Sequence, residues 1–537
     1  MLRFEDAVKM NHSRKLFVLA FVCVVLFSIA LIIHAAESYK QQNRDAISDI
    51  VDGDYDSAIK HFEKYLDDHP GDLESLYGLV IAYAQKNKKD KAIAYVKQAV
   101  EAGLPFSRFL AGPRNLLEPL TDSAEFEVLA KEHAVELLHG PMLGCVTDKN
   151  AKFWVRTANE VLVQVLVSNS ENMDSPIKSA VARTSKDKDF TAVVTVRDLK
   201  PDTRYYYELL VDGKKEPRLW SFHTLPASST KAKFQIGFGG GAGYNPPHER
   251  MWNTIVAHRP IAFLFLGDNV YIDNPTRLAV QRYCYYRRQC RPEFRDFTAS
   301  TAIYAIWDDH DFTTDDGWGG PDIHEPAWKI PVWRVFCENW NNPYYGGGEE
   351  QPGCWFDFSI GDVDFFMLDC RYYRMDPNAK NPSMLGGAQK KWLFEKLKAS
   401  KGTFKVLASS VPWAFGTKPG SRDTWEGYKE EREEIFSFLQ NNKIEGVFLL
   451  SADRHRSDAW KIERPNGYDL YEFESSKLTN VHTHKLMPGA LFGYNKKCSF
   501  GLLSLDTTLT DPQVIYRIIS IDNEVVHTLT LRQSQMR

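Results

Sequence analysis

The sequence predicts a multidomain protein: an N-terminal transmembrane helix, a short α-helical segment, a β-sandwich and a C-terminal domain of layered α/β architecture. Three observations lead to this expectation: an apolar run near the N-terminus, a helical pattern that recurs after 34 residues, and buried strands that alternate with helices beyond residue 232. The chain of 537 residues is also too long for a single hydrophobic core.

The composition is that of a folded protein with balanced charge. Hydrophobic residues make up 43% of the chain and charged residues 25%, as in ordinary globular proteins. The 66 Lys and Arg residues nearly balance the 70 Asp and Glu residues, so no basic surface for a nucleic-acid backbone is indicated. We therefore expect no nucleic-acid partner.

Residues 1–36 are expected to form a membrane anchor. An apolar run at residues 16–33 follows four basic residues and is long enough to cross a membrane as a helix. It exceeds the roughly 7 to 15 apolar residues of a secretory signal peptide, although a removed signal peptide is the alternative. Because the positive flank stays in the cytoplasm, the prediction is a single-pass type II protein with residue 37 onward extracytoplasmic, in the periplasm or at the cell surface.

A helical segment at residues 45–133 contains a repeat. Within residues 53–70 and 88–105, Ala58 matches Ala92 with a period of 34 residues. This period, with small residues where two helices meet, resembles tetratricopeptide repeats. A binding site for a protein partner is one expectation for such a segment, and a plain helical stalk is the other.

Residues 140–226 are predicted to form a small β-sandwich. Short runs of alternating apolar and polar residues are separated by Asn, Asp, Gly and Pro turn signals. The stretch at residues 199–205 is similar to the corner of fibronectin type III modules, where a tyrosine hydroxyl holds the chain. Nothing in this segment suggests catalysis.

The segment 232–537 combines buried strands with helical patterns. Apolar runs that predict buried strands lie at residues 234–238, 261–266, 301–306, 363–368, 404–407 and 446–450. Helical patterns include residues 388–398 and 428–440. In a layered α/β sheet the ligands gather at the carboxyl ends of the strands, and polar residues accumulate at those positions here.

Acidic residues and histidines directly follow three of the predicted strands. Asp268 follows the second run, Asp309 and His310 follow the third, and Asp453 and His455 follow the last. A single Asp at a strand end is usually a turn residue. Several converging carboxylates would repel one another and be costly to bury, so a bound cation is the economical explanation.

Three motifs carry a resemblance to a known family. They are Gly267-Asp-Asn-Val-Tyr271, Asp308-Asp-His-Asp311 and Ala452-Asp-Arg-His455, and further matching stretches lie at residues 368–371, 385–393 and 409–412. From about residue 140 onward the chain resembles the calcineurin-like metallophosphoesterase superfamily and, within it, the PhoD-like alkaline phosphatases and phosphodiesterases. The resemblance implies an α/β/β/α sandwich at residues 232–537 that hydrolyses phosphate mono- or diesters.

The resemblance also implies a role for each motif residue. Asp268 would bridge two metal ions, Tyr271 would bind one of them, and His310 would be the catalytic histidine beside the leaving group. The expected metal ligands are Asp268, Tyr271, Asp309, Asp453 and His455; the expected catalytic residues are His310 and Arg371; and the expected substrate contacts are Asn269 and Arg454.

The implied cofactors are divalent or trivalent metal ions. Mixed Asp, His and Tyr ligation suits Fe, together with Ca, Mn or Zn. Two such ions would hold a phosphoryl oxygen and lower the pKa of a bound water. Arg371 and Arg454 are candidates to neutralise the remaining phosphate charge, and surface salt bridges are the alternative for both.

The sequence departs from the family at the end of its first catalytic strand. The superfamily's Asp-x-His motif is absent, and so is the cysteine of PhoD-like proteins, since Phe238 is followed by a glycine run that includes Gly241. One metal ion would then be undercoordinated or completed by Tyr244, Asp308 or a water. We interpret the glycine run as a tight turn, with a phosphate-binding loop as the alternative.

Two other groups of polar residues allow more than one interpretation. His482 and His484 have metal-like spacing but follow the motifs in a loop, so they are expected to line the pocket or face solvent. The aromatic and basic cluster at residues 283–288 either contacts the organic part of a substrate or packs locally.

An exported chain permits disulfides. Cys284 with Cys290 and Cys337 with Cys354 are the pairs considered, and the spacing assigns neither.

These expectations describe a membrane-anchored phosphoesterase. Because all proposed ligands lie beyond residue 234, residues 1–139 are expected to be dispensable for catalysis. One rival is a non-catalytic phosphate sensor or scaffold that recruits partners through its helical repeats. The other is a metal hydrolase that acts on a non-phosphate ester.

Overall fold

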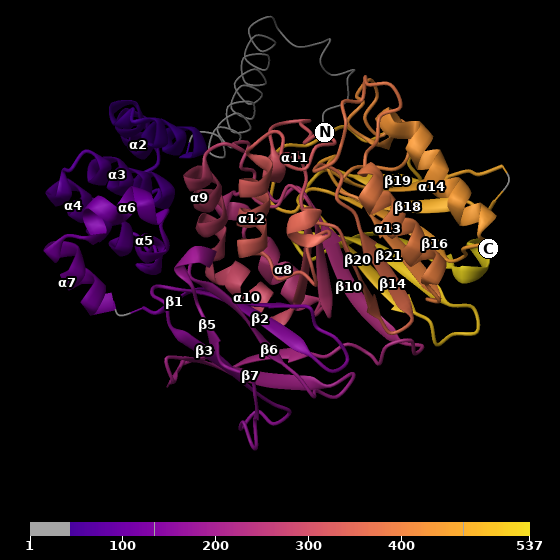
Figure 1. Ribbon diagram of the computed structural model, residues 1–537, viewed down its shortest axis with the longest axis horizontal. Coiled ribbons are helices and arrows are strands. Elements are labelled where there is room, and N and C mark those ends of the chain that lie inside the picture. Colours follow the sequence, from indigo (N-terminus) through magenta and orange to yellow (C-terminus); the bar gives the residue numbers. More distant parts are fainter. Residues whose placement is uncertain (1–42, 134, 466) are drawn as a thin grey trace, which may run out of the picture.

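A computed structural model describes residues 43–133, 135–465 and 467–537. The predicted membrane helix at residues 16–33 lies outside these ranges. Within them, no helix combines the length and the apolar character that a membrane span requires. The described chain begins with a block of helices and continues into three β-sheets with helices packed around them (Figure 1).

The N-terminal block consists of short antiparallel helices. Residues 43–52 are helical, and the helices that follow are α2 (Tyr55–Asp68), α3 (Leu73–Gln85), α4 (Lys89–Glu101), α5 (Ser107–Ala111), α6 (Arg114–Thr121) and α7 (Ala124–His133). Asp54 caps α2 by accepting a hydrogen bond from the backbone N–H of Ser57. Ala58 and Ala92 are fully buried, so the repeated helices pack closely as their spacing predicted.

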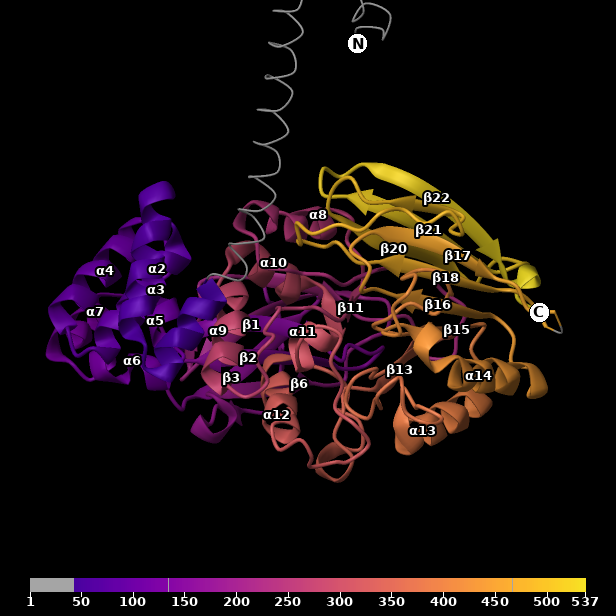
Figure 2. The same ribbon diagram turned by 90° about the horizontal axis from the view of Figure 1, so that it is seen from above.

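This block packs against α9 (Leu278–Gln289) and does not stand apart as a stalk (Figure 2). The guanidinium of Arg108 in α5 is fully buried, 3.9 Å from the ring centre of Tyr77 and 5.2 Å from that of Tyr283 in α9. Glu74 lies 3.6 Å from Arg108 and balances its charge. Of the two interpretations of the cluster at residues 283–288, the structure supports local packing.

The following segment is a β-sandwich that shares one of its sheets with the segment after residue 232. Its strands are β1 (Leu137–Gly144), β2 (Ala151–Thr157), β3 (Leu162–Ser168), β4 (Ile177–Lys178), β5 (Ala182–Arg183), β6 (Thr191–Val196), β7 (Arg204–Val211), β8 (Lys214–Lys215) and β9 (Trp220–His223). The hydroxyl of Tyr205 accepts a hydrogen bond of 2.9 Å from the N–H of Lys200, which confirms the predicted corner. However, β1 pairs in parallel with β12 (Ala302–Ile306) and protects its edge, so the sandwich is not an independent unit.

The segment after residue 232 is built on two large sheets. The nine-stranded sheet runs in the order β22-β21-β20-β10-β11-β12-β1-β2-β6, and the seven-stranded sheet in the order β13-β14-β15-β16-β18-β17-β19. The remaining strands are β10 (Lys233–Gly239), β11 (Ala262–Leu266), β13 (Phe356–Ile360), β14 (Val363–Met367), β15 (Phe404–Ala408), β16 (Val447–Ser451), β17 (Ser457–Ile462), β18 (Leu470–Ser475), β19 (Phe492–Tyr494), β20 (Ser499–Asp506), β21 (Gln513–Ser520) and β22 (Val525–Arg532).

The two sheets pack face to face, with helices on their outer sides. Tyr516 of β21 stacks on Phe473 of β18 with ring centres 4.5 Å apart. Trp252 of α8 packs on Phe265 of β11 at 5.8 Å, and α13 buries Leu393 in a core with the seven-stranded sheet. The helices concerned are α8 (Met251–Ala257), α10 (Pro292–Ser300), α12 (Lys329–Asn339), α13 (Gly386–Ala399) and α14 (Lys429–Asn441). This is the α/β/β/α arrangement that the resemblance implied.

Candidate metal centre and active site

The loops after β11, β12 and β16 bring five of the predicted site residues together. Oδ2 of Asp268 lies 3.8 Å from Nε2 of His455, and this nitrogen lies 2.9 Å from the hydroxyl of Tyr271, 184 positions away in the chain. Asp268, Asp309 and His310 each offer a ligand atom, and these atoms lie within 4.8 Å of one another. Residues that are distant in sequence thus form one cluster between the two sheets.

The carboxylates of this cluster are crowded and removed from water. Asp268 is 1% exposed, and among the described residues neither of its carboxylate oxygens has a hydrogen-bond partner. Burial raises the pKa of Asp268 well above its usual range, and the carboxylates of Asp309 and Asp308 raise it further, while His310 opposes them. Burial likewise raises the pKa of Asp308 to about 8. A cation would remove this cost, so the donor set fits the expected metal ions.

The backbone at these residues adopts an uncommon conformation. The φ angle is 55° at Asp268, 54° at Tyr271, 71° at Asp453 and 47° at His455. Left-handed conformations are unfavourable for residues with a Cβ atom and persist only where the surrounding structure enforces them. Such strain clusters at functional sites, and here it falls on four of the five predicted metal ligands.

His310 lies in the short helix α11 (Asp309–Phe312), where a carboxylate orients its ring. Its Nδ1 bonds to the carboxylate of Asp273, and its carbonyl oxygen accepts a hydrogen bond of 3.1 Å from the N–H of Asp273. Nδ1 therefore carries a proton, and Nε2 lies on the open side, 3.6 Å from the exposed Asp315. Burial lowers the pKa of His310, but the nearby carboxylates, Asp309 foremost, outweigh it and raise the pKa well above its ordinary value.

Arg371 is placed differently from the sequence expectation. Its side chain is fully buried: Nε bonds to Asp308, Nη1 lies 2.8 Å from Asp423, and Nη2 lies 3.5 Å from Asp309. It is neither a surface salt bridge nor a group that faces an open substrate site. Its contacts instead hold the two aspartates of the second motif in position.

The two predicted substrate contacts also differ from each other. Asn269 is 1% exposed, and its amide donates a hydrogen bond of 2.8 Å to the carbonyl of Ile306, so it holds the loop after β11. Arg454 lies at the site, where its guanidinium is 3.3 Å from Asp453 and 3.2 Å from Nδ1 of His484. Within the described residues, the carboxylate of Asp453 joins none of the close groups of potential ligands.

The glycine run after β10 makes a close backbone contact with the loop after β18. The N–H of Asn480 donates a hydrogen bond of 3.2 Å to the carbonyl of Gly241, and a Cβ atom at Gly241 would lie only 2.7 Å from the carbonyl oxygen of Ser476. The contact carries the loop after β18 into the site. There the Asn480 amide donates a hydrogen bond of 2.7 Å to the hydroxyl of Tyr271.

Neither side chain considered as a substitute for the missing cysteine lies in the cluster around Asp268. The ring of Tyr244 lies under the guanidinium of Arg287, 4.9 Å away. Asp308 bonds to Arg371 and accepts a hydrogen bond of 2.8 Å from Ser410.

His482 and His484 lie beside the predicted ligand His455. Their ring centres are 5.0 Å and 5.4 Å from that of His455, so both histidines line the site. This was one of the two expectations, and exposure to solvent was the other. All seven described cysteines are free, and the disulfide pairs considered from the sequence are not formed.

Sequence reasoning missed two residues of the site, Asp273 and Asn480. Asp273 stands two positions after Tyr271, and this proximity to the first motif was the available signal. Asn480 carried no such signal, because it reaches Tyr271 from 209 positions away through the glycine contact.

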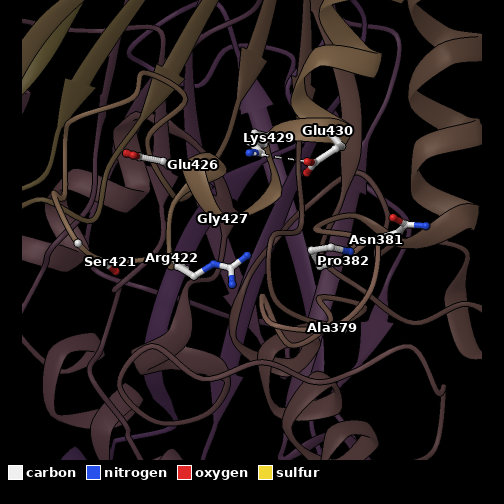
Figure 3. Close-up of a pocket in the computed structure, with 10 residues that line it drawn as sticks. Ala379, Asn381, Pro382, Ser421, Arg422, Glu426, Gly427, Lys429 and Glu430 are labelled. Carbon is white, nitrogen blue, oxygen red and sulfur yellow. Dashed lines mark ion pairs between the residues drawn. The ribbon is translucent and has the colours of Figure 1, made fainter.

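A surface cavity lies apart from this cluster. It has a volume of about 550 Å³ and is lined by residues of two segments, 379–382 and 420–430, the second of which runs into the start of α14 (Figure 3). Arg422 points along its wall and donates a hydrogen bond of 2.7 Å to Asn378. None of the predicted site residues lines this cavity.

Comparisons with known proteins agree with the geometry. Residues 236–487 match the PhoD-like phosphatase family, residues 134–227 match a domain of unknown function, and residues 51–110 match the tetratricopeptide repeat. Alkaline phosphatase D of Bacillus subtilis (strain 168) is 32% identical over 330 residues, which cover 52% of this chain and 55% of that protein. The chain thus spans about half the length of this curated relative.

Two solved structures share the fold. A structure of PhoD superposes with a TM-score of 0.62 at 18% identity and covers 74% of this chain and 90% of its own. A purple acid phosphatase from yellow lupin (Lupinus luteus) seeds superposes with a TM-score of 0.54 at 11% identity, covering 74% and 75% of the two chains.

Proposed function

We propose that the protein is a metal-dependent hydrolase of phosphate mono- or diesters, because residues 236–487 match the PhoD-like phosphatase family. The observation that supports this most strongly is the buried cluster of Asp268, Tyr271, Asp309, His310 and His455 at three strand ends. The crowded, buried carboxylates and the left-handed backbone of this cluster are costly features, which metal binding and catalysis would explain.

In this proposal the metal ligands are those that the motifs predicted. Asp268, Tyr271, Asp309, Asp453 and His455 would hold the ions, Fe together with Ca, Mn or Zn. Bound ions would neutralise phosphoryl oxygens and lower the pKa of a water.

The chain's own residues would complete the chemistry. His310 keeps Nδ1 on Asp273 and presents Nε2 to the open side, where it would donate a proton to the leaving oxygen. Arg454, which borders the site beside Asp453, would bind a phosphate oxygen. Arg371 would act only indirectly, by holding Asp308 and Asp309.

A substrate panel tests the proposal. Purified protein loaded with iron and calcium is assayed with a p-nitrophenyl phosphate monoester, a bis-p-nitrophenyl phosphate diester and p-nitrophenyl acetate. We expect turnover of a phosphate ester, loss of this activity in Asp268→Asn, and no loss in the exposed control Asp67→Asn. Turnover of the acetate alone would support a non-phosphate esterase, and phosphate binding without any turnover would support the sensor.

We further propose that the catalytic segment works outside the cytoplasm. The support is the sequence alone: the basic residues ahead of the apolar run at 16–33. In intact cells, a protease added from outside would then cleave the segment after residue 232. Protection from the protease until the membrane is permeabilised would contradict this orientation.

A further inference from the structure

We propose that Arg44 is a positioning residue for His310, an inference that rests on the proposed function. Arg44 lies in the helical stretch 43–52, ahead of the tetratricopeptide-like helices and 229 positions from its partner Asp273. Through this contact, the N-terminal helical block completes the support of the catalytic histidine.

The connection is a chain of three side chains. Nη1 of Arg44 bonds to Oδ2 of Asp273, and the other oxygen of that carboxylate, Oδ1, bonds to Nδ1 of His310. The three side chains are mostly buried, with exposed fractions of 11% for Arg44, 17% for Asp273 and 18% for His310. Each carboxylate oxygen therefore has one partner, which fixes the rotation of the carboxylate and hence the direction of the imidazole ring.

The backbone around Asp273 depends on such support. Tyr271 and Asp273 have φ angles of 54° and 49°, and this conformation persists only when several contacts enforce it. Hydrogen bonds of 2.7 Å and 3.1 Å run from the N–H groups of Ile272 and Asp273 to the carbonyl of His310. Nη1 of Arg44 also donates to the carbonyl of Tyr271 at 3.5 Å. Arg44 thus holds the loop that contains Tyr271, a predicted metal ligand, and Asp273, which orients His310.

The helical stretch is held in place independently of Arg44. Asp52 forms a bidentate pair with Arg277, with distances of 2.9 Å and 2.6 Å. The amide of Asn274 donates a hydrogen bond of 3.3 Å to the hydroxyl of Ser48, and Ile47 is fully buried. Removing the guanidinium of Arg44 should therefore release Asp273 without detaching the helix.

A simple structural salt bridge would make the same contact with Asp273, so the test must report on His310 itself. A general acid matters more when the leaving group is a stronger base, because such a group needs the proton at departure. Loss of alignment at His310 should therefore slow an ester of phenol more than an ester of p-nitrophenol. A general loss of folded protein would slow both esters equally.

The experiment compares the full-length variants Arg44→Met, Arg44→Lys and Asp273→Asn with the matched control Asp52→Asn on the same helical stretch. For Arg44→Met we expect kcat on the phenyl ester to fall by about 10- to 100-fold, a smaller fall on the p-nitrophenyl ester, and little change in KM or metal content. Arg44→Lys should retain more activity than Arg44→Met, Asp273→Asn should show the same selective loss, and Asp52→Asn should keep the wild-type ratio of the two rates.

A double variant separates positioning from stability. In the His310→Ala background, Arg44→Met should cause no further loss, because the residue that it orients is gone. The inference is overturned if Arg44→Met slows both esters equally, if Asp52→Asn shows the same selective loss, or if the losses of Arg44→Met and His310→Ala multiply. A wild-type protein that hydrolyses neither ester overturns the proposed function, and the inference with it. If the wild type is active and Arg44→Met slows both esters equally, only the inference about Arg44 is overturned.

Discussion

His310 has two sets of neighbours that suggest different roles. Nδ1 bonds to Asp273, as in an oriented acid–base catalyst, yet the side chain also lies within ligand distance of Asp268 and Asp309. The bond to Asp273 and the open side at Nε2 favour proton transfer over metal binding.

His310→Ala is therefore expected to reduce turnover while the metal content stays nearly intact. General acid–base groups contribute about 10² to 10⁴-fold to the rate, and the loss should fall in this range. Steady-state kinetics and elemental analysis of the same preparation measure both quantities. If the variant loses a metal ion, His310 is a ligand; if it keeps the wild-type rate, His310 has no part in the reaction.

Tyr271 offers a spectroscopic test of the metal site. Burial raises the pKa of its phenol well above the ordinary value near 10, and Asp268 raises it further. Only a strongly polarising cation would make this phenol an anionic ligand at neutral pH, and ferric iron meets this need better than Ca or Mg. Iron-loaded, oxidised protein should therefore show a broad visible charge-transfer band.

The band should disappear in Tyr271→Phe, and Asp268→Asn should lose both the band and the activity. A band that persists in Tyr271→Phe, or a colourless protein that is active with iron, would make Tyr271 a packed aromatic residue at the strand end. Absorption spectra and iron content of matched samples decide between these outcomes.

For single residues, the sequence predicted the site residues that lie in contiguous motifs. It missed the site residues that lie far from these motifs in the sequence. Asp268, Tyr271, Asp309 and His310 follow their strands directly, and a sheet brings its strand ends together. Arg44 and Asn480 reach the same place through long-range contacts. No local pattern marks such a contact, because it depends on how separate elements pack.

Among the elements, the backbone after β10 has a strict steric requirement at Gly241. Gly241 has a φ of 65°, and a side chain there would meet the carbonyl of Ser476. Gly241→Ala should lower the free energy of unfolding by about 1 to 3 kcal/mol, the usual cost of such strain, and should also lower activity by moving Asn480.

Gly387→Ala is the matched control for this change. Gly387 lies in α13 with open space where its Cβ atom would be, so the substitution should be neutral or slightly stabilising. Chemical denaturation of both variants measures the difference. Equal stability of the two variants would show that the turn at Gly241 tolerates a side chain.

The strands of the catalytic segment illustrate what periodicity can and cannot predict. Each of the six predicted strands is present with its ends within one residue of the expected positions, as in β11 and β16, because buried parallel strands are continuous apolar runs. The C-terminal strands β20, β21 and β22 were not predicted. β20 is almost entirely buried, whereas the apolar patterns of β21 and β22 alternate and are weaker, and one face of β22 is exposed.

In the whole molecule, the nine-stranded sheet joins the β-sandwich to the segment after residue 232. The sequence predicted these two as separate domains. The sequence predicted an independent sandwich, because its alternating pattern resembles that of a free-standing module. Pairing between β1 and β12 could not be predicted, because the two strands lie about 160 residues apart in the sequence. The local apolar pattern of one strand does not indicate which other strand it will pair with.

A fragment of residues 232–537 should therefore aggregate or unfold. Without β1, the hydrogen-bonding edge of β12 would be exposed, and an unprotected edge strand pairs with other chains. Size-exclusion chromatography and thermal unfolding of the fragment and the full chain measure this. A monomeric fragment with full activity would show that the shared sheet is dispensable.

The same reasoning revises the expectation that residues 1–139 are dispensable for catalysis. Removing them would take away Arg44, which contacts Asp273, and the first three of the eight residues of β1, which begins at Leu137. Loss of activity in such a truncation would combine both effects, whereas Arg44→Met isolates the first.

The claim that a metal centre at Asp268 drives phosphate ester hydrolysis is tested most directly by removal and return of the metal. Purified protein is stripped with a chelator, reloaded with defined ions, and followed by elemental analysis and by the rate on a p-nitrophenyl phosphate ester. We expect activity to disappear with the metal and to return in proportion to its rebinding, while Asp268→Asn neither rebinds the metal fully nor recovers activity. Full phosphatase activity in metal-free protein, or a metal-loaded protein that hydrolyses no phosphate ester, would contradict the account.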